Sequence, residues 1–380
     1  MTPYFVLLAF LLVFGLVMRE RCMTIGRNGM TGYLVVACSA MALLAALRAP
    51  TVGADTQQYV EIFNWVKTLP ISNIGELNRF AWWDSAGNIE ITYKVYNKIV
   101  SLLCDDQQVI TVANSLVLMA AFFRMVKRES KDYWLSALLF FCLGFYQLSL
   151  NLTPSSIAAL IMFGSVSYVR EQKIIPWLTS TLVACIFHTS AIMLFPLYWL
   201  FQLRINKRRF FTLILIGCAL GLIAYRPVAS ILAALVPGSY VGYLSSTKVK
   251  PEQVLVLTAL IALVLMAILS KKESLFKSEN RIHLWVVVLI CISYAFSINN
   301  TYITRFAFLL SPYLVVTIPN LLYDGGYLKR IDLSANKTLA MRSSESWAFL
   351  IVVFAVALYL ARSSVNNIGT TVPYLFFFSV

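Results

Sequence analysis

The sequence predicts an all-α protein that crosses a membrane many times, and three observations support this fold class. Hydrophobic residues make up 59% of the 380-residue chain and charged residues only 13%, about half the share that is usual in soluble domains. Uninterrupted apolar runs of about 18–20 residues recur along the chain, which is the length of a transmembrane helix. The basic residues gather in the short segments between these runs. Runs of this length favour membrane helices over the strands of a barrel.

The apolar runs predict about 11–12 transmembrane helices. The first run is followed by Arg19 and Arg21 and has no basic segment before it, which indicates a retained span instead of a cleaved signal peptide. The segments 174–187 and 189–203 are each too short to cross a bilayer at about 1.5 Å per residue. They form either one long tilted helix or a broken pair that meets at His188. In chain order, we expect helices at residues 3–18, 30–47, 107–124, 133–150, 154–169, 174–187, 189–203, 210–225, 253–270, 283–298, 305–322 and 346–361.

The distribution of basic residues predicts which loops lie on which side of the membrane. Two thirds of the 31 Lys and Arg residues lie in the segments 19–29, 124–132, 170–173, 204–209, 271–282 and 323–345. The positive-inside rule places these segments in the cytoplasm, so both termini and the loops 48–106 and 226–252 lie outside. The net charge of +14 reflects this topology, and we expect no nucleic-acid partner. Residues 1–380 are expected to form a single integral membrane domain.

The first outer loop, 48–106, contains two patterns that predict amphipathic helices. The first helix begins after Asp55 and places apolar residues at helical spacing, at Tyr59, Ile62, Phe63 and Val66. The second helix covers about 89–103 and carries an apolar face formed by Ile91, Val95, Ile99 and Leu102. Helices of this kind can lie in the interface of the bilayer.

Two arginines stand at the outer ends of expected spans and allow two interpretations each. Arg48 and Arg305 could be anchors, because a long cationic side chain at a helix end can reach the membrane surface. A guanidinium could instead hold phosphate oxygens with two parallel hydrogen bonds. Arg226 lies in the second outer loop, and Tyr302 precedes Arg305 on the same side of the membrane.

Three further ionisable side chains are candidate site residues, and two of them, Asp55 and His188, are candidates for proton transfer. Asp55 could cap its helix with Gln58 in a D-x-x-Q capping box, or it could be a catalytic carboxylate. Glu90 could pair with Lys94 one helical turn later, or it could contact a substrate. His188 lies within an apolar run, where it is either bonded structurally or acts as a general base.

Five segments carry a resemblance to a known family. They are LRAPTVGADTQQYVEIF, NIEITYKVYNKIV, FHTSAIMLFPLYWL, YITRFAFLLSPYLV and VPYLFF. In this order and spacing they resemble the EpsG-like branch of the Wzy-type polysaccharide polymerases. The resemblance covers most of the chain, and its most specific element is R-x4-G-x-D-T-x2-Y, which extends from Arg48 to Tyr59.

The resemblance implies a GT-C-like helical glycosyltransferase that uses no metal and no cofactor. Such proteins join undecaprenyl-diphosphate-linked oligosaccharide repeat units into O-antigen, capsule or exopolysaccharide at the outer face of the bacterial inner membrane. The implied partners are the lipid-linked oligosaccharide, the bilayer, and the chain-length regulator and flippase of the same pathway. The residues expected to be catalytic are Asp55 and His188. The residues expected to bind the substrate are Arg48, Arg305, Arg226, Tyr59, Glu90 and Tyr302.

Two other classes of protein remain open at this point. A transporter, such as the flippase of the same pathway, would suit about twelve spans, although the chain shows no clear internal repeat. A membrane acyltransferase would need a deeply placed histidine with an acidic partner, and the sequence suggests no such partner. No metal site is expected, because the outer carboxylates between residues 55 and 90 are scattered and include no D-x-D pair.

Overall fold

The computed structural model describes residues 1–25, 27–70, 90–223, 273–297, 303–325, 351–361 and 367–379. Within these residues the protein is all-helical, without a β-strand, so the predicted fold class of a polytopic helical membrane protein is confirmed. Four helices in this part of the chain are long and apolar enough to cross a membrane: Gly29–Ala46, Gln108–Glu129, Ser278–Ser297 and Arg305–Asp324. Shorter apolar helices are Thr2–Met18, Ile174–Phe187, Thr189–Leu200 and Ile351–Ala361.

Packing divides the chain into two compact units, Met1–Pro196 with Lys329–Val380, and Leu197–Leu328. The expectation of one integral domain stays a prediction. The first unit begins with α1 (Thr2–Ile25), which continues past the expected end at residue 18. Its further helices are α2 (Arg27–Ala46), α3 (Thr56–Thr68), α4 (Ile91–Ser101), α5 (Gln108–Glu129), α6 (Tyr133–Cys142), α7 (Phe145–Asn151), α8 (Thr153–Phe163), α9 (Ser167–Arg170), α10 (Ile174–Phe187), η3 (Thr189–Leu194), Ile351–Ala361, η8 (Ile368–Thr370) and η9 (Phe377–Ser379).

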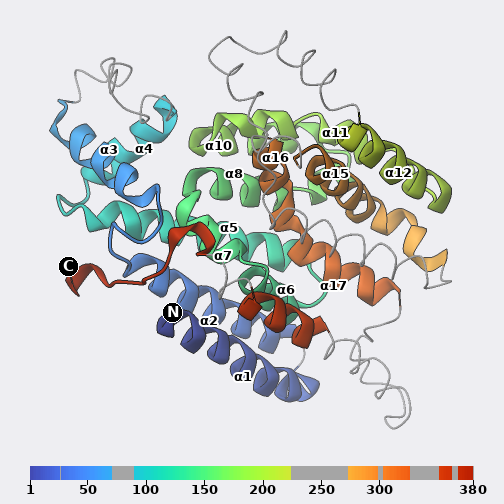
Figure 1. Ribbon diagram of the computed structural model, residues 1–380, viewed down its shortest axis with the longest axis horizontal. Coiled ribbons are helices and arrows are strands. Elements are labelled where there is room, and N and C mark those ends of the chain that lie inside the picture. Colours follow the sequence, from blue (N-terminus) through green and yellow to red (C-terminus); the bar gives the residue numbers. More distant parts are fainter. Residues whose placement is uncertain are drawn as a thin grey trace. The chain divides into compact units, whose positions relative to one another are not determined.

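The core of the first unit is built around α5, which packs against α2 and α8 (Figure 1). On either side of this group, α1 packs on α2 and α10 packs on α8. Every residue of α6 is buried, including Phe140 and Phe141, because its sequence is apolar on all sides. A helix that is apolar all round belongs in the interior of a helix bundle.

Two of the expected spans are interrupted. The run 133–150 forms α6 and α7, which are bent by 58° relative to each other. The bend contains Gly144 at φ 79°, a left-handed conformation that glycine adopts without strain. The run 174–203 is broken at His188, which has an extended backbone (φ −152°, ψ 112°) and ends α10. Of the two forms that the sequence left open for 174–203, the structure shows the broken pair.

The second unit contains α11 (Leu197–Leu200), α12 (Lys207–Ile223), η5 (Glu273–Phe276), η6 (Ser278–Asn280), α15 (Arg281–Ser297), α16 (Ile303–Leu310), η7 (Ser311–Tyr313) and α17 (Leu314–Asp324). In this unit α15 packs against both α12 and α16. His283 on α15 is buried, with its ring nitrogens 3.2 Å from Thr317 Oγ1 and 3.0 Å from Asn320 Nδ2. The expected helix 253–270 lies outside the described residues.

Candidate functional site

Arg48 lies just past the end of α2 and is buried, with only 2% of its surface exposed. Its Nη1 donates to the carbonyl oxygen of Ala45 at 2.5 Å and to Ser115 Oγ at 3.4 Å. Its Nη2 donates to the carbonyl oxygen of Leu150 at 3.5 Å. Both carbonyls belong to last turns of helices, α2 and α7, where each helix end carries about half a unit of negative charge. The side chain therefore faces the protein interior, and the interpretation as an exposed membrane anchor is wrong.

The guanidinium of Arg48 retains one unused donor. Within the part of the chain that the structure describes, its Nε has no hydrogen-bond partner and no carboxylate forms an ion pair with it. Burial lowers the pKa of this guanidinium, while the tyrosines around it act in the opposite direction. Among the described residues, the charge of Arg48 is therefore balanced by helix ends and not by a neighbouring acid.

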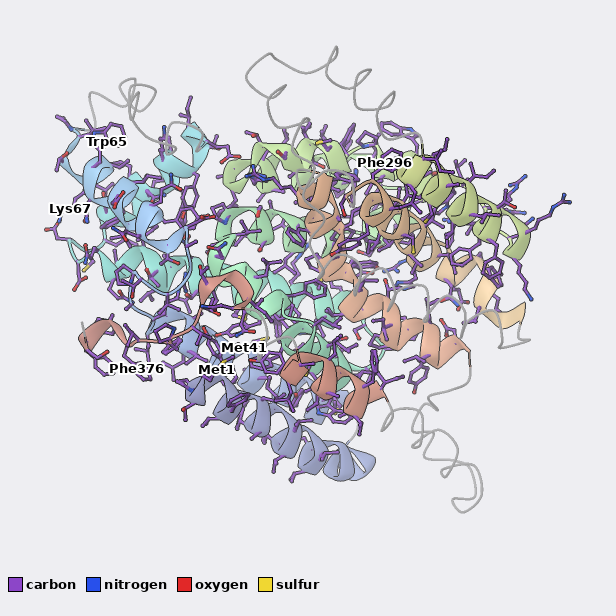
Figure 2. The ribbon with its side chains drawn as sticks, in the orientation of Figure 1. Met1, Met41, Trp65, Lys67, Phe296 and Phe376 are labelled. Atoms are coloured by element: carbon purple, nitrogen blue, oxygen red, sulfur yellow. The ribbon has the colours of Figure 1, made fainter. Side chains whose placement is uncertain are left out.

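The C-terminal segment 367–379 is joined to the backbone on both sides of Arg48. Ala49 N–H donates to the carbonyl oxygen of Leu375 at 2.9 Å, and Phe377 N–H donates to the carbonyl oxygen of Leu47 at 3.0 Å. These two bonds form an antiparallel bridge between Arg48 and Phe376. Phe376 is labelled in Figure 2. The first and the last of the five motif segments thus meet at Arg48, although more than three hundred residues separate them in the sequence.

The tight turn between Arg48 and α3 requires a glycine at position 53. The φ of Gly53 is 96°, and a Cβ added there would lie 2.7 Å from Thr56 Oγ1 and 3.3 Å from the carbonyl oxygen of Leu150. Its N–H donates to the carbonyl oxygen of Thr370 in the C-terminal segment at 3.1 Å. A larger residue would both strain this turn and separate it from α7.

Asp55 occupies the N-cap position of α3, but the predicted capping box is wrong. Its backbone is helical (φ −94°, ψ −6°), and its side chain makes no capping hydrogen bond. A capping side chain needs an extended backbone at this position to reach the first free N–H groups. Instead, the N–H of Asp55 donates to Asn151 Oδ1 at 2.9 Å. The carboxylate, which is half-buried, is therefore not used to begin the helix.

Tyr59 lies among the charged groups of this region. Its hydroxyl donates to the carbonyl oxygen of Asn151 at 3.2 Å. Burial raises the pKa of Tyr59 well above its ordinary value, and nearby Tyr93, Asp55 and Glu90 raise it further, whereas Arg48 lowers it. Because these charges all act on one hydroxyl, the structure brings together residues that the sequence distributes over positions 48–90.

The predicted apolar face of α3 is confirmed, whereas on α4 only Val95 of the predicted apolar face packs against the core, next to Ile62 and Val66. Tyr59, Ile62, Phe63 and Val66 on α3 are all buried. On α4, by contrast, Ile91, Ile99 and Leu102 are exposed by 45%, 57% and 61% of their surface. The buried face of α4 is largely polar and contains Tyr93, Lys94, Asn97, Lys98, Val100 and Ser101. An outward apolar face and an inward polar face suit a helix that lies at the bilayer interface and turns its polar side towards a site.

His188 and Glu90 form a hydrogen-bonded pair, with His188 Nδ1 donating to Glu90 Oε1 at 2.7 Å, and the pair becomes an ion pair when the histidine is protonated. The same oxygen accepts from the N–H of Thr189 at 3.1 Å and from its hydroxyl at 3.2 Å. Burial alone would raise the pKa of Glu90, but the bonds from His188 and Thr189 lower it overall. The expectation that His188 has no acidic partner is therefore wrong. The histidine side chain is 31% exposed, so the pair lies at an accessible position.

A series of aromatic rings connects the His188 end of the region to the Asp55 end. The ring centroids of Tyr59 and Tyr93 are 5.8 Å apart, those of Tyr93 and Tyr96 are 5.8 Å apart, and those of Tyr96 and Phe187 are 5.3 Å apart. Burial raises the pKa of Tyr96 to about 12, and its buried hydroxyl has no hydrogen-bond partner in the described residues. Tyr59 and Tyr93 are buried, so their rings are part of the packed interior of this region.

The remaining expected site residues belong to the second unit or lie outside the described residues. Arg305 lies in the first turns of α16 and is exposed. Arg226 and Tyr302 lie outside the described residues. The sequence analysis missed Asn151, which contacts both Asp55 and Tyr59, and it missed the position of the C-terminal segment. The motif VPYLFF was the only signal for that segment.

One helical unit thus contains a histidine–carboxylate pair, a buried arginine and a series of tyrosine rings. The family model of the EpsG family matches residues 32–376, which is nearly the whole chain, and the chain belongs to this family. The EpsG family is a Wzy-type polymerase-like family, and membership supports a polysaccharide polymerase-type role. A search of curated proteins and a search of solved structures gave no significant match.

Proposed function

We propose that this protein polymerises undecaprenyl-diphosphate-linked oligosaccharide repeat units by glycosyl transfer at the outer face of the bacterial inner membrane. The observation that supports this most is the family match over residues 32–376, because it covers every residue of the candidate site. In this reaction a sugar hydroxyl attacks the anomeric carbon of a lipid-linked donor. The bond from that carbon to the diphosphate breaks, and undecaprenyl diphosphate leaves with the electron pair.

His188 is the proposed base for the acceptor hydroxyl. Its Nδ1 is held by Glu90 at 2.7 Å, so Nε2 is the ring nitrogen that takes the proton. The carboxylate of Glu90 orients the ring and stabilises the imidazolium that forms, as the third group of a catalytic triad does. The sequence left the base open between Asp55 and His188, with the larger effect expected at Asp55, whereas the contact with Glu90 favours the histidine. Asp55 and Tyr59 then position the acceptor sugar.

The arginines balance the charge of the leaving diphosphate. Arg48 acts from a buried position, where its charge is little screened by water and its bonds hold the ends of α2 and α7 in place. For Arg226 and Arg305, the sequence-based expectation that they hold the phosphate oxygens stays a prediction. With arginine as the source of positive charge, the reaction needs no divalent metal. Full activity in excess EDTA tests this part, and loss of activity that magnesium restores would contradict it.

A deletion strain separates this function from that of a flippase. Without a polymerase, lipopolysaccharide or surface polysaccharide carries a single repeat unit, and a gel shows one band in place of a ladder. Without a flippase, no repeat unit reaches the surface. We expect the single band, with the ladder restored by the wild-type gene and not by His188→Gln. A surface without any repeat unit would instead support the transporter.

A further inference from the structure

A second cluster of charged and aromatic side chains lies at the far end of α5 from the candidate site. Arg124 and Arg128 are one helical turn apart on α5, so they share a face of the helix. Arg124 Nη2 and Arg128 Nη1 both donate to the hydroxyl of Tyr168, each at 3.3 Å. The guanidinium of Arg128 also lies over the ring of Tyr168, with its Cζ 4.7 Å from the ring centroid.

The two arginines meet at a neutral group and not at an acid. Within the described residues, neither Arg124 nor Arg128 forms an ion pair with a carboxylate. The acids next to them are already paired, Glu129 with Arg170 and Glu171 with Lys173. Two guanidiniums that share one phenol oxygen repel each other, and an anion between them would remove this repulsion.

The cluster opens into a cavity of about 540 Å³ between α8 and α10. Ile161, Ile175 and Val183 contribute apolar walls, and the polar lining is formed by Arg124, Ser165, Tyr168, Thr179 and Ser180. Arg128 does not line the cavity but donates to the Tyr168 hydroxyl, which does. The outward side of α10 continues this apolar surface, with Ile175 exposed by 75% and Leu182 by 57%. In Figure 1, α8 and α10 lie side by side, in agreement with their packing. The cavity thus combines a cationic end with an apolar wall that continues onto an exposed helix face.

The length of α5 places this cavity at the opposite membrane face from the candidate site. Gln108, at the start of α5, donates to the backbone carbonyl of Arg48 at 3.0 Å. Arg124 lies sixteen residues further along the helix, which corresponds to about 24 Å. Lys127, Lys131 and Lys173 add further positive charge near this end of the bundle. Basic pockets between transmembrane helices at the cytoplasmic face are suited to anionic lipid headgroups.

We propose that this cavity binds an anionic phospholipid of the membrane leaflet opposite the candidate catalytic site. The headgroup phosphate lies beside Arg124 and the Tyr168 hydroxyl, where Arg128 adds a second positive charge, and the acyl chains follow the exposed apolar face of α10. This site is separate from the proposed polymerase chemistry, and neither depends on the other. The lipid would hold α5, α8 and α10 together at the end of the bundle that carries no catalytic group.

Lipid binding to the purified full-length protein in detergent tests the proposal. Native mass spectrometry would compare phosphatidylglycerol with phosphatidylcholine, and inorganic phosphate would be added as a competitor. We expect wild-type protein to retain phosphatidylglycerol in preference to phosphatidylcholine, with inorganic phosphate unable to displace it at equal concentration. Each of Arg124→Gln and Arg128→Gln should weaken phosphatidylglycerol binding about fivefold, and the double variant about 25-fold.

The matched control is Lys207→Gln, which removes one exposed positive charge from the first turn of α12, outside the cavity. It should leave phosphatidylglycerol binding unchanged. Equal retention of phosphatidylcholine would show an apolar surface without headgroup recognition, and displacement by inorganic phosphate would show a site for free anions. Unchanged binding in the double variant would also overturn the proposal. The lipid comparison uses wild-type protein, so it decides the matter even if a variant does not fold.

Discussion

Glu90→Gln is the substitution that separates a catalytic His188–Glu90 pair from a structural one. Glutamine retains an acceptor oxygen for His188 and Thr189, so the contact between α4 and the start of η3 is preserved. What it removes is the negative charge 2.7 Å from the histidine ring. A hydrogen bond to a charged group contributes about 1.5–3 kcal/mol and a neutral one about 0.5–1.5, so the stabilisation lost is about 1.5 kcal/mol.

If the pair acts on the transition state, that loss lowers turnover about tenfold, because each 1.4 kcal/mol corresponds to one factor of ten. His188→Gln, which removes the base itself, should lower turnover at least about 100-fold. The assay is polymer formation from lipid-linked repeat units at saturating substrate, with KM expected to change little. Glu61→Gln is the matched control, since Glu61 is an exposed glutamate on α3 that bonds only to Gln57 in the described residues. Wild-type turnover in Glu90→Gln would refute the catalytic reading and leave the pair as a structural link.

Four further predictions follow from the contacts of this region. Arg48→Lys keeps the charge but cannot bridge the carbonyls of Ala45 and Leu150, so both polymer length and the midpoint of thermal unfolding should fall; a wild-type midpoint would show that these bonds do not hold α2 and α7. Asp55→Asn removes no capping bond, so unfolding should be unchanged while turnover falls at least about tenfold, and normal turnover would exclude a role in positioning the acceptor. The pKa of Glu90 is lowered in the folded protein, so its contribution to stability is present above its ordinary pKa of 4.5 and is lost as the pH falls below that value. The midpoint of thermal unfolding of Glu90→Gln should therefore depend less on pH in this acidic range than that of the wild type. An equal dependence on pH in both proteins would contradict the contact between Glu90 and His188. Cys104 is an exposed free cysteine, and in intact cells it should react with a membrane-impermeant maleimide if the loop 48–106 lies outside; reaction only after permeabilisation would invert the topology.

Within the described residues, local pattern predicted where most helices lie, but not their breaks or the faces that they bury. The apolar face of α3 was predictable because the residues that recur at helical spacing there are also the buried ones. The prediction for α4 failed because the rule that apolar faces are buried assumes that the protein is surrounded by water. At a membrane interface an apolar face can instead turn outward to the lipid. The break at His188 was predictable as one of two forms, since both flanking runs are too short to cross a bilayer.

The contacts that define the candidate site connect distant parts of the chain and leave no local signal. Glu90 and His188 are almost one hundred residues apart, and nothing near either residue indicates the other. The bridge between Arg48 and Phe376 likewise depends on tertiary packing. Asp55 does not cap α3 because its backbone is helical. The sequence around it is a regular capping pattern and does not reveal this conformation. Sequence therefore indicated which residues are candidates, and the fold showed which of them lie together.

Extension of lipid-linked repeat units by the purified protein alone tests the central claim most directly. The protein would be reconstituted in nanodiscs, supplied with undecaprenyl-diphosphate-linked repeat units, and the products separated by size. We predict a ladder of lengthened products with release of one undecaprenyl diphosphate for each unit joined, and no ladder with His188→Gln. Repeat units that stay at their starting length with the folded wild-type protein, but cross the bilayer when the protein is placed in liposomes, would contradict the polymerase and identify a transporter.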